Sequence, residues 1–223
     1  MPKGPDLQRL RRARAHRLSI PPTTAVVLCG GRGSRLGGVD KPLVELAGKT
    51  LLARLIERLE PQVDAVVLSG VRERRDYEAL GYPLVEDGDR DQGPLAGIVS
   101  ARSVVRTPWI LTTPVDTPFL PLNLVSSLAP TCQRTGAAVV TAGGHRQNLA
   151  MLLDPDRVES LARFYTGGGR AVHRWLAAHG VEEVELPAAG FFNINTPDDL
   201  ARAGELLPTL ERTVATRQGS SVP

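Results

Sequence analysis

A glycine-rich segment that also carries two basic residues is the part of the sequence with the clearest chemistry. It runs from Cys29 to Lys41 and holds five glycines within nine positions. Glycine lets a backbone turn sharply and bring its N–H groups close to an anion, because no Cβ stands in the way. Arg35 offers a planar guanidinium fork and Lys41 a compact charge, and both side chains are typical ligands of phosphate groups. The segment is therefore predicted to bind the phosphates of a nucleotide.

The residues around this segment decide between a binding site and a flexible glycine-rich surface loop, which is the alternative for such a pattern. The apolar run Ala25–Leu28 precedes it and is typical of a strand buried in a parallel sheet. The loop matches neither the dinucleotide fingerprint, Gly-x-Gly-x-x-Gly, nor the P-loop, which needs Gly-Lys-Ser/Thr after four spacer residues. The preceding strand, the charged residues and the lack of serine–glycine linker composition favour a phosphate site of another kind.

An aspartate between two prolines is the second candidate for chemistry. Asp116 follows the apolar run Trp109–Leu111, and Pro114 and Pro118 restrict the backbone on either side of it. A carboxylate at a strand end facing a phosphate loop suits Mg²⁺, which binds one or two carboxylates, water and phosphate oxygens. The alternative is an aspartate that stabilises a turn before a helix. Beside the glycine-rich loop, Asp116 is predicted to be a magnesium ligand.

The loop and three later segments together resemble one family. Leu28-x-Gly30-Gly31-x-x-x-Arg35-Leu36-Gly37-Gly38-x-Asp40-Lys41 is similar to the signature of the nucleotidyltransferase superfamily, in the variant of the molybdenum cofactor guanylyltransferases. Three further segments follow in the family's order: Gly93-Pro94-Leu95-Ala96-Gly97, Thr113–Pro118 and Phe192–Leu200. The resemblance covers about Thr24 to Ala203, and four elements in order are harder to obtain by chance than one motif.

The resemblance assigns roles to the residues at matching positions. It implies catalytic roles for Arg35, Lys41 and Asp116, with Asp116 as the metal ligand. The nucleotide site that it implies consists of Leu28, Cys29, Gly30, Gly31, Lys41, Ser69, Asp87 and Asp116. Asn193 and Asn195 alternate along an expected strand, so both amides are expected to face the second substrate or the waters of the metal. A structural role for Asn195, at the turn before the next helix, is the alternative.

Two positions bear on the choice of base. Asp87 matches the aspartate to which the family assigns a guanosine contact, and a carboxylate can accept two hydrogen bonds from the N1 and N2 edge of guanine. A solvated loop acid is an equally good interpretation of Asp87. Ser69 stands where the family often has an asparagine, so one amide contact to the ribose or base is absent.

The resemblance implies transfer of GMP from GTP to the terminal phosphate of molybdopterin cofactor, with Mg²⁺ bound and pyrophosphate released. A molybdopterin cytidylyltransferase or a sugar-phosphate nucleotidyltransferase is the nearest alternative, because all of them share the loop and Lys41-Pro42-Leu43. A nucleotide-binding carrier of molybdenum cofactor is the alternative outside enzymes. Cofactor-inserting proteins or apo-molybdoenzymes are the further partners expected.

The elements that must position these residues alternate between strand and helix. This order predicts an α/β fold with a mainly parallel central sheet flanked by helices, and the resemblance implies a single-domain Rossmann-like nucleotidyltransferase fold. The strands expected are Ala25–Leu28, Ala65–Leu68, Leu84–Val85, Trp109–Leu111, Ala137–Val140, Ala150–Leu153 and Phe191–Asn195. The helices expected are Leu51–Leu59, Gly93–Ala101, Arg157–Thr166, Ala171–His179 and one that starts at Thr196. Because ligands of such sheets bind beyond the carboxyl ends of the strands, the candidate residues are expected to converge there.

Charge is distributed unevenly along the chain. Met1–Arg17 carries six basic residues and one acidic residue, whereas the rest of the chain has a net charge of −2. This excludes a basic nucleic-acid-binding domain. We expect residues 1–22 to be a basic, disordered head, residues 23–208 to be the nucleotidyltransferase domain and residues 209–223 to be a disordered tail.

Location is also constrained by the sequence. No apolar run is long enough to span a membrane, and the head lacks the apolar core of a secretory signal. We therefore expect a cytoplasmic protein that does not interact with membranes, although an arginine-rich transit peptide is the alternative for the head. Two cysteines exclude a disulfide framework and a cysteine-ligated metal.

Overall fold

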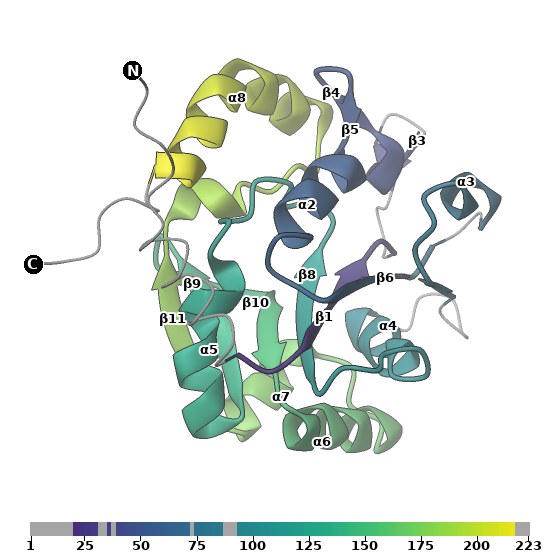
Figure 1. The fold of residues 1–223 in the computed structure, drawn as a ribbon, viewed down its shortest axis with the longest axis vertical. Helices are drawn as coiled ribbons and strands as arrows, with labels where there is room; N and C mark the ends of the chain where they lie inside the picture. Colours follow the sequence, from purple (N-terminus) through teal and green to yellow (C-terminus); the bar gives the residue numbers. More distant parts are fainter. Residues whose placement is uncertain (1–19, 31–34, 37–38, 72–73, 87–92, 217–223) are drawn as a thin grey trace, which may run out of the picture.

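A seven-stranded sheet runs through the protein, and helices cover both of its faces (Figure 1). The computed structural model describes residues 20–30, 35–36, 39–71, 74–86 and 93–216. The strand order is β11-β9-β10-β8-β1-β6-β7, and all strands are parallel except β10, which is antiparallel to β8 and β9. The strands are β1 (Thr23–Leu28), β6 (Ala65–Ser69), β7 (Leu84–Val85), β8 (Trp109–Pro114), β9 (Ala137–Ala142), β10 (His145–Leu153) and β11 (Glu182–Leu186). The predicted α/β fold with a mainly parallel central sheet is confirmed.

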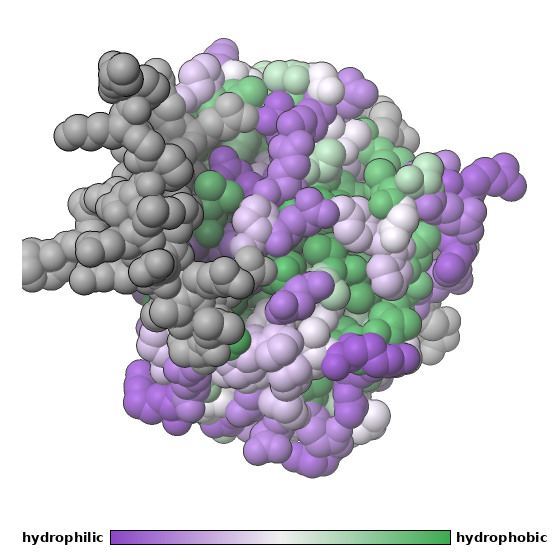
Figure 2. All heavy atoms as spheres, in the orientation of Figure 1, coloured by the Kyte–Doolittle hydropathy of each residue, from purple (hydrophilic) through white to green (hydrophobic). Residues whose placement is uncertain are grey.

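Two helical layers pack on the sheet because successive side chains of a strand point to opposite faces. Ala25 and Val27 of β1 lie in the apolar core under α2 and α5, whereas Val26 and Leu28 lie in the core under α4, α6 and α7. On the face shown in Figure 2, hydrophilic residues gather along the lower rim, where α6 lies in Figure 1. The helices are α2 (Leu51–Leu59), α3 (Arg75–Glu78), α4 (Pro94–Ala101), α5 (Leu124–Thr135), α6 (Pro155–Thr166), α7 (Val172–Ala178) and α8 (Pro197–Thr216).

Short elements that the sequence did not predict lie within the glycine-rich segment and directly after it. They are the antiparallel pair β2 (Arg35–Leu36) and β3 (Val39–Asp40), the 3-10 helix η1 (Lys41–Leu43), and the hairpin of β4 (Glu45–Leu46) and β5 (Lys49–Thr50). A third apolar cluster contains Leu36, Leu46 and Ile194 together with residues of α8. The C-terminal helix therefore packs against the chain that leaves the glycine-rich loop.

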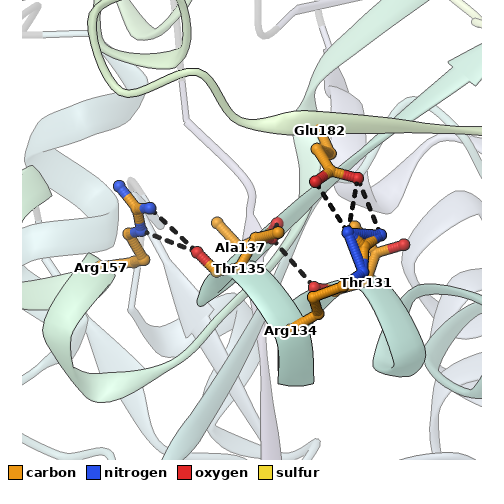
Figure 3. Close-up of polar contacts among 6 residues, drawn as sticks. All are labelled: Thr131, Arg134, Thr135, Ala137, Arg157 and Glu182. Atoms are coloured by element: carbon orange, nitrogen blue, oxygen red, sulfur yellow. Dashed lines mark hydrogen bonds and ion pairs between the residues drawn. The ribbon is translucent and has the colours of Figure 1, made fainter.

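Side chains also fix the junction of α5 with the sheet (Figure 3). Gly136 ends α5 at φ 82°, in the left-handed region that favours glycine, and its N–H donates to the Cys132 carbonyl at 2.8 Å. Arg157 donates two hydrogen bonds to the Thr135 carbonyl, at 3.2 and 2.9 Å, and Arg134 pairs with Glu182 of β11 at 2.8 Å. These contacts lie at the amino ends of the parallel strands, away from the edge that carries the candidate residues.

The expected strand at Phe191–Asn195 is wrong. The chain forms a 3-10 turn there, η2 (Ala188–Phe191), and Ile194 then donates its backbone N–H to the Asp116 carbonyl at 2.9 Å. The physical reason is close packing on the loop after β8, since a Cβ on Gly190 would lie 2.9 Å from Cδ of Pro121. The segment pairs with that loop rather than with the sheet.

The expected boundaries of the domain differ from the structure at its C-terminal side. Helix α8 continues to Thr216, so the tail expected from residue 209 starts too early. Leu206, Leu207 and Leu210 pack with the third apolar cluster, which explains why the helix persists. At the other end, the Trp109 N–H donates to the Pro22 carbonyl at 3.2 Å, so the last residues assigned to the head lie against the sheet.

The rest of the expected head and tail, residues 1–19 and 217–223, lies outside the described residues. Within the described ranges, none of the helices has the length and apolar composition needed to cross a bilayer.

Candidate active site

The loops that carry the candidate residues leave the sheet side by side. Leu28, Ser69 and Pro114 are register neighbours at the carboxyl ends of β1, β6 and β8. The Cys29 N–H donates to the Ser69 carbonyl at 2.8 Å, and the Val115 N–H donates to the Leu28 carbonyl at 3.2 Å. These hydrogen bonds extend the parallel pairing past the strands, so the three loops start from one rigid edge.

Gly30 is required by close packing at this edge. A Cβ built on it would lie 2.7 Å from the carbonyl oxygen of Gly70, a distance that side chains do not tolerate. Cys29, before it, is 3% exposed, and its thiol points back toward the Val27 carbonyl at 3.7 Å. At the start of the glycine-rich loop, the Cys29 side chain therefore points into the core, whereas Gly30 is exposed.

Lys41 lies at the centre of the contacts. It is 8% exposed, and its Nζ donates to Oδ1 of Asn195 at 2.7 Å and lies 3.8 Å from Oδ2 of Asp116. The contact with Asn195 is a hydrogen bond. The contact with Asp116 is an ion pair, because its distance is too long for a hydrogen bond. Pro42 follows in η1, and the Val44 N–H donates to the Lys41 carbonyl at 3.1 Å. The structure therefore brings together three residues predicted from the sequence: Lys41, Asp116 and Asn195.

Asp116 is held in an electrostatically unusual environment. Burial raises the pKa of its carboxyl above the ordinary value, and the neighbouring Lys41 charge and a backbone hydrogen bond offset only part of this rise. Its Oδ1 is buried and has no hydrogen-bond partner among the residues that the structure describes, which is costly for a carboxylate oxygen. A buried carboxylate oxygen that no described residue engages fits a divalent cation that completes its shell with water and phosphate oxygens. In the described part of the chain, no three His, Cys, Asp or Glu side chains group closely enough to hold an ion by themselves.

The two asparagines do not lie in a strand, but both are exposed and flank the buried Ile194, so the prediction that both amides face one side stays a prediction. Both lie in the segment between η2 and α8, and Asn195 accepts a hydrogen bond from Lys41. Asp199 fixes Asn195, because its Oδ2 accepts hydrogen bonds from the N–H groups of Asn195 at 3.0 Å and of Thr196 at 2.9 Å. Thr196 Oγ1 in turn accepts from the Asp199 N–H at 3.1 Å, which completes a capping box.

Ser69 is fully buried, and its hydroxyl donates to the Gly97 carbonyl at 2.9 Å. This hydrogen bond ties the end of β6 to the first turns of α4, the helix that Gly93-Pro94 opens with Gly93 at φ 80°. The side chain is thus already engaged within the fold. A contact of Ser69 with nucleotide stays a prediction, as do the nucleotide contacts of Leu28, Cys29 and Gly30.

Some predicted residues cannot be placed in the site. Gly31 and Asp87 lie outside the described residues, and Arg35 is placed only through its backbone, in β2 opposite Asp40. Their roles stay predictions.

Tyr77 was missed by sequence reasoning. It is fully buried in α3, and its hydroxyl donates to Oδ2 of Asp40 at 2.5 Å. Burial, together with the adjacent Asp40 carboxylate, raises the pKa of Tyr77 strongly, so the hydroxyl keeps its proton. A tyrosine in a short helix between two strands is typical of core packing, and no motif marks it.

Known proteins resemble this chain in sequence and in fold. Residues 25–184 match the model of the MobA-like NTP transferase domain. A protein of Methylibium petroleiphilum named molybdenum cofactor guanylyltransferase is 42% identical over 190 residues, which are 80% of this chain and 94% of that protein. A protein of the same name from Cupriavidus taiwanensis is 39% identical over 186 residues, which are 79% of this chain and 94% of that protein.

A solved structure shares the fold. The molybdopterin-guanine dinucleotide biosynthesis protein A of Archaeoglobus fulgidus superimposes with a TM-score of 0.64 at 25% identity. The match covers 83% of this chain and 99% of that one.

Proposed function

We propose, since the chain belongs to the family of MobA-like NTP transferase domains, that it transfers GMP from GTP to the terminal phosphate of molybdopterin cofactor and releases pyrophosphate. The observation that carries this proposal is the convergence of three side chains at the end of the glycine-rich segment. Lys41 contacts both Asn195 and Asp116 there. A site for binding alone needs no carboxylate with a buried, uncommitted oxygen beside a phosphate loop. Asp116 therefore favours catalysis over a carrier role.

The reaction exchanges one P–O bond for another. An oxygen of the acceptor phosphate attacks the α-phosphorus of GTP in line, and the bond to the pyrophosphate oxygen breaks. Lys41 and Arg35 offset the negative charge on the phosphates, and backbone N–H groups of the loop position them. Lys41 is held ready for this role, because Asn195 orients its ammonium group at 2.7 Å without neutralising its charge.

We propose Mg²⁺ as the metal, with Asp116 as its protein ligand. The buried Oδ1, which has no partner among the described residues, is the position at which the carboxylate would bind it. Bound there, the cation would reduce the charge on the nucleotide phosphate oxygens. Asn195 and Asn193 are proposed to face the second substrate, Asn195 through its contact with Lys41 and Asn193 from its exposed position.

Recognition of guanine is proposed for Asp87, which follows β7 by two residues and precedes the Gly93–Gly97 segment that opens α4. A carboxylate there would accept hydrogen bonds from N1 and N2 of guanine, a pair of donors that cytosine lacks. The cytoplasmic location and the transfer of product to cofactor-inserting proteins or apo-molybdoenzymes stay predictions from the sequence.

Competition between GTP and CTP tests the proposed function. The purified chain, Mg²⁺ and molybdopterin are mixed with equal amounts of both nucleotides, and the dinucleotide products and pyrophosphate are measured. A site that pairs with the guanine edge loses about 1–3 kcal/mol for each unpaired partner with the wrong base. Two such partners favour GTP by about tenfold to several thousandfold.

Inosine triphosphate, which lacks only the 2-amino group, should fall between the two nucleotides. Because Ser69 replaces an amide, we expect the lower part of the range. Equal use of the two nucleotides, or a preference for CTP, would replace the guanylyltransferase assignment with a cytidylyltransferase. Nucleotide binding without pyrophosphate release would support the carrier instead.

A further inference from the structure

Two aspartates in the described part of the chain have a buried carboxylate oxygen without a hydrogen-bond partner, Asp116 and Asp40. The proposed metal explains the first. Asp40 immediately precedes Lys41, at the point where the chain passes from the glycine-rich loop into η1. Burying one carboxylate oxygen without a partner costs free energy, so the other oxygen of Asp40 is expected to make a favourable contact that offsets this cost.

That contact is the hydrogen bond from Tyr77. An aspartate before a helix usually accepts hydrogen bonds from the first N–H groups of that helix, but Asp40 makes no such contact in η1. Its Oδ2 instead lies 2.5 Å from the Tyr77 hydroxyl. Tyr77 is 0% exposed and packs in the main apolar core with Cys29, Val71 and residues of α2. The core therefore holds the Tyr77 side chain in place, and its hydrogen bond to Asp40 ties the start of η1 to the core.

The attachment determines where Lys41 lies. The β2–β3 pair, which ends at Asp40, is a sheet of its own and does not pair with the central sheet. The side chain of Lys41 is held at its far end by Asn195. Its backbone is held at the near end by the hydrogen bond from Tyr77 to the preceding residue. A bond between a hydroxyl that keeps its proton and a carboxylate is strong and directional.

We propose that Tyr77 is a positioning residue for nucleotidyl transfer: through its hydrogen bond to Asp40 it holds the start of η1, and with it Lys41, against the ends of the strands. This inference rests on the proposed function, because Lys41 must act on the nucleotide phosphates. Tyr77 touches neither substrate in this role and acts through Asp40 alone.

Substitution of each partner tests the role. Tyr77→Phe keeps the buried ring and removes only the hydroxyl, and Asp40→Ala removes the acceptor. Each should lower kcat/KM for GMP transfer by roughly tenfold to a hundredfold, the usual effect of losing a hydrogen bond to a charged group. Asp40→Asn keeps an acceptor for the Tyr77 hydroxyl but loses the charge that strengthens the bond, so its loss should be smaller than that of Asp40→Ala.

Tyr82→Phe is the matched control. The Tyr82 hydroxyl also donates to a carboxylate, Oε1 of Glu60, at 2.8 Å, but on the exposed surface. This variant should keep the wild-type kcat/KM. Melting curves of all variants are recorded, so that activity is expressed per folded protein.

A double-mutant cycle with Lys41 separates positioning from a general loss of structure. In a Lys41→Ala background, Tyr77→Phe should change the residual kcat/KM by less than about twofold, because no lysine is left to position. The same loss in both backgrounds, or a folded Tyr77→Phe variant with wild-type activity, overturns the inference. A loss in Asp40→Asn as large as that in Asp40→Ala also overturns it, because the retained hydrogen bond would then contribute nothing. Failure of the proposed function is distinguishable, because the wild type itself would then transfer no GMP.

Discussion

At the scale of single residues, the site holds a lysine and an aspartate close together as an ion pair without a hydrogen bond between them. Lys41 and Asp116 lie 3.8 Å apart, near enough to attract and too far to share a hydrogen bond. Burial leaves the Asp116 carboxyl with a raised pKa, so the fold disfavours the ionised form that a metal requires. Such a cost is typical of residues that serve chemistry rather than stability.

Asp116→Asn should show that Asp116 serves catalysis rather than stability. The amide is close to the carboxylate in shape but cannot neutralise a cation, so kcat should fall by about a hundredfold or more. Asp198→Asn, which changes an exposed acid in the first turn of α8, is the matched control and should keep full activity. Wild-type turnover by Asp116→Asn would refute the metal assignment.

The raised pKa of Asp116 also predicts the pH dependence of activity and stability. The acidic limb of kcat/KM should lie above the ordinary aspartate range of about 4, because the carboxyl protonates more readily in the folded protein. For stability the sign is the reverse of that for a paired acid: the favourable contribution is present at low pH and is lost as pH rises through the folded pKa. Without added metal, Asp116→Asn should therefore melt no lower than the wild type at pH 8. A clearly lower melting temperature would contradict this.

Residue types and spacing singled out Lys41 and Asp116, because phosphate and magnesium chemistry restricts the side chains that can serve; the fold brings the two together, and their roles stay predictions. Tyr77 could not be found in this way. Its partner Asp40 was visible in the motif, but only the fold brings α3 beside the start of η1.

At the scale of elements, the segment between η2 and α8 determines how Asn195 is presented to Lys41. The alternation of Asn193 and Asn195 suggested a strand, but pairing of Ile194 with the Asp116 carbonyl removes the segment from the sheet. Periodicity alone does not distinguish the two cases, because a short extended stretch gives the same pattern whether or not a neighbouring strand is available. The start of the last helix at Thr196 was predicted correctly, since it depends on local residue types.

The capping box gives a prediction for Asp199. Hydrogen bonds from the N–H of Asn195, the side chain of Thr196 and the N–H of Thr196 lower the pKa of its carboxyl. Its contribution to stability is therefore present above the unfolded pKa, about 3.9, and is lost as pH falls through the folded pKa. Asp199→Ala should melt below the wild type at pH 7, and the difference should shrink in acid.

Measuring the activity of an Asp199 variant shows whether Asp199 only caps α8 or also positions Asn195. Asp199→Ala releases the backbone N–H of Asn195, so kcat/KM should fall by up to about tenfold in protein that is still folded. Asp198→Ala is the control at the neighbouring exposed position. Unchanged activity in a destabilised Asp199→Ala would show that Asn195 is positioned by other contacts.

At the scale of the whole molecule, the alternation of apolar strands and amphipathic helices was enough to predict the sheet, its mainly parallel order and the edge at which the loops converge. The ends of the domain were harder to predict. Helix α8 reaches Thr216 because its leucines meet a third apolar cluster built from residues far apart in the sequence. The composition of the chain near residue 209 does not indicate that α8 packs against this cluster.

The basic head provides the last prediction. Residues Met1–Arg17 hold the excess positive charge of the chain but no core-building pattern. Ile20 packs against the core, and Pro22 already pairs with Trp109, so the described fold starts after the charged segment. Deleting residues 1–19 should therefore leave the melting temperature and turnover unchanged. A deletion of residues 1–24 is the control: it removes two buried residues of β1, Thr23 and Thr24, and should lower the melting temperature. A higher KM for GTP at low salt after the shorter deletion would contradict the prediction, because it would mean that the head attracts the anionic substrate.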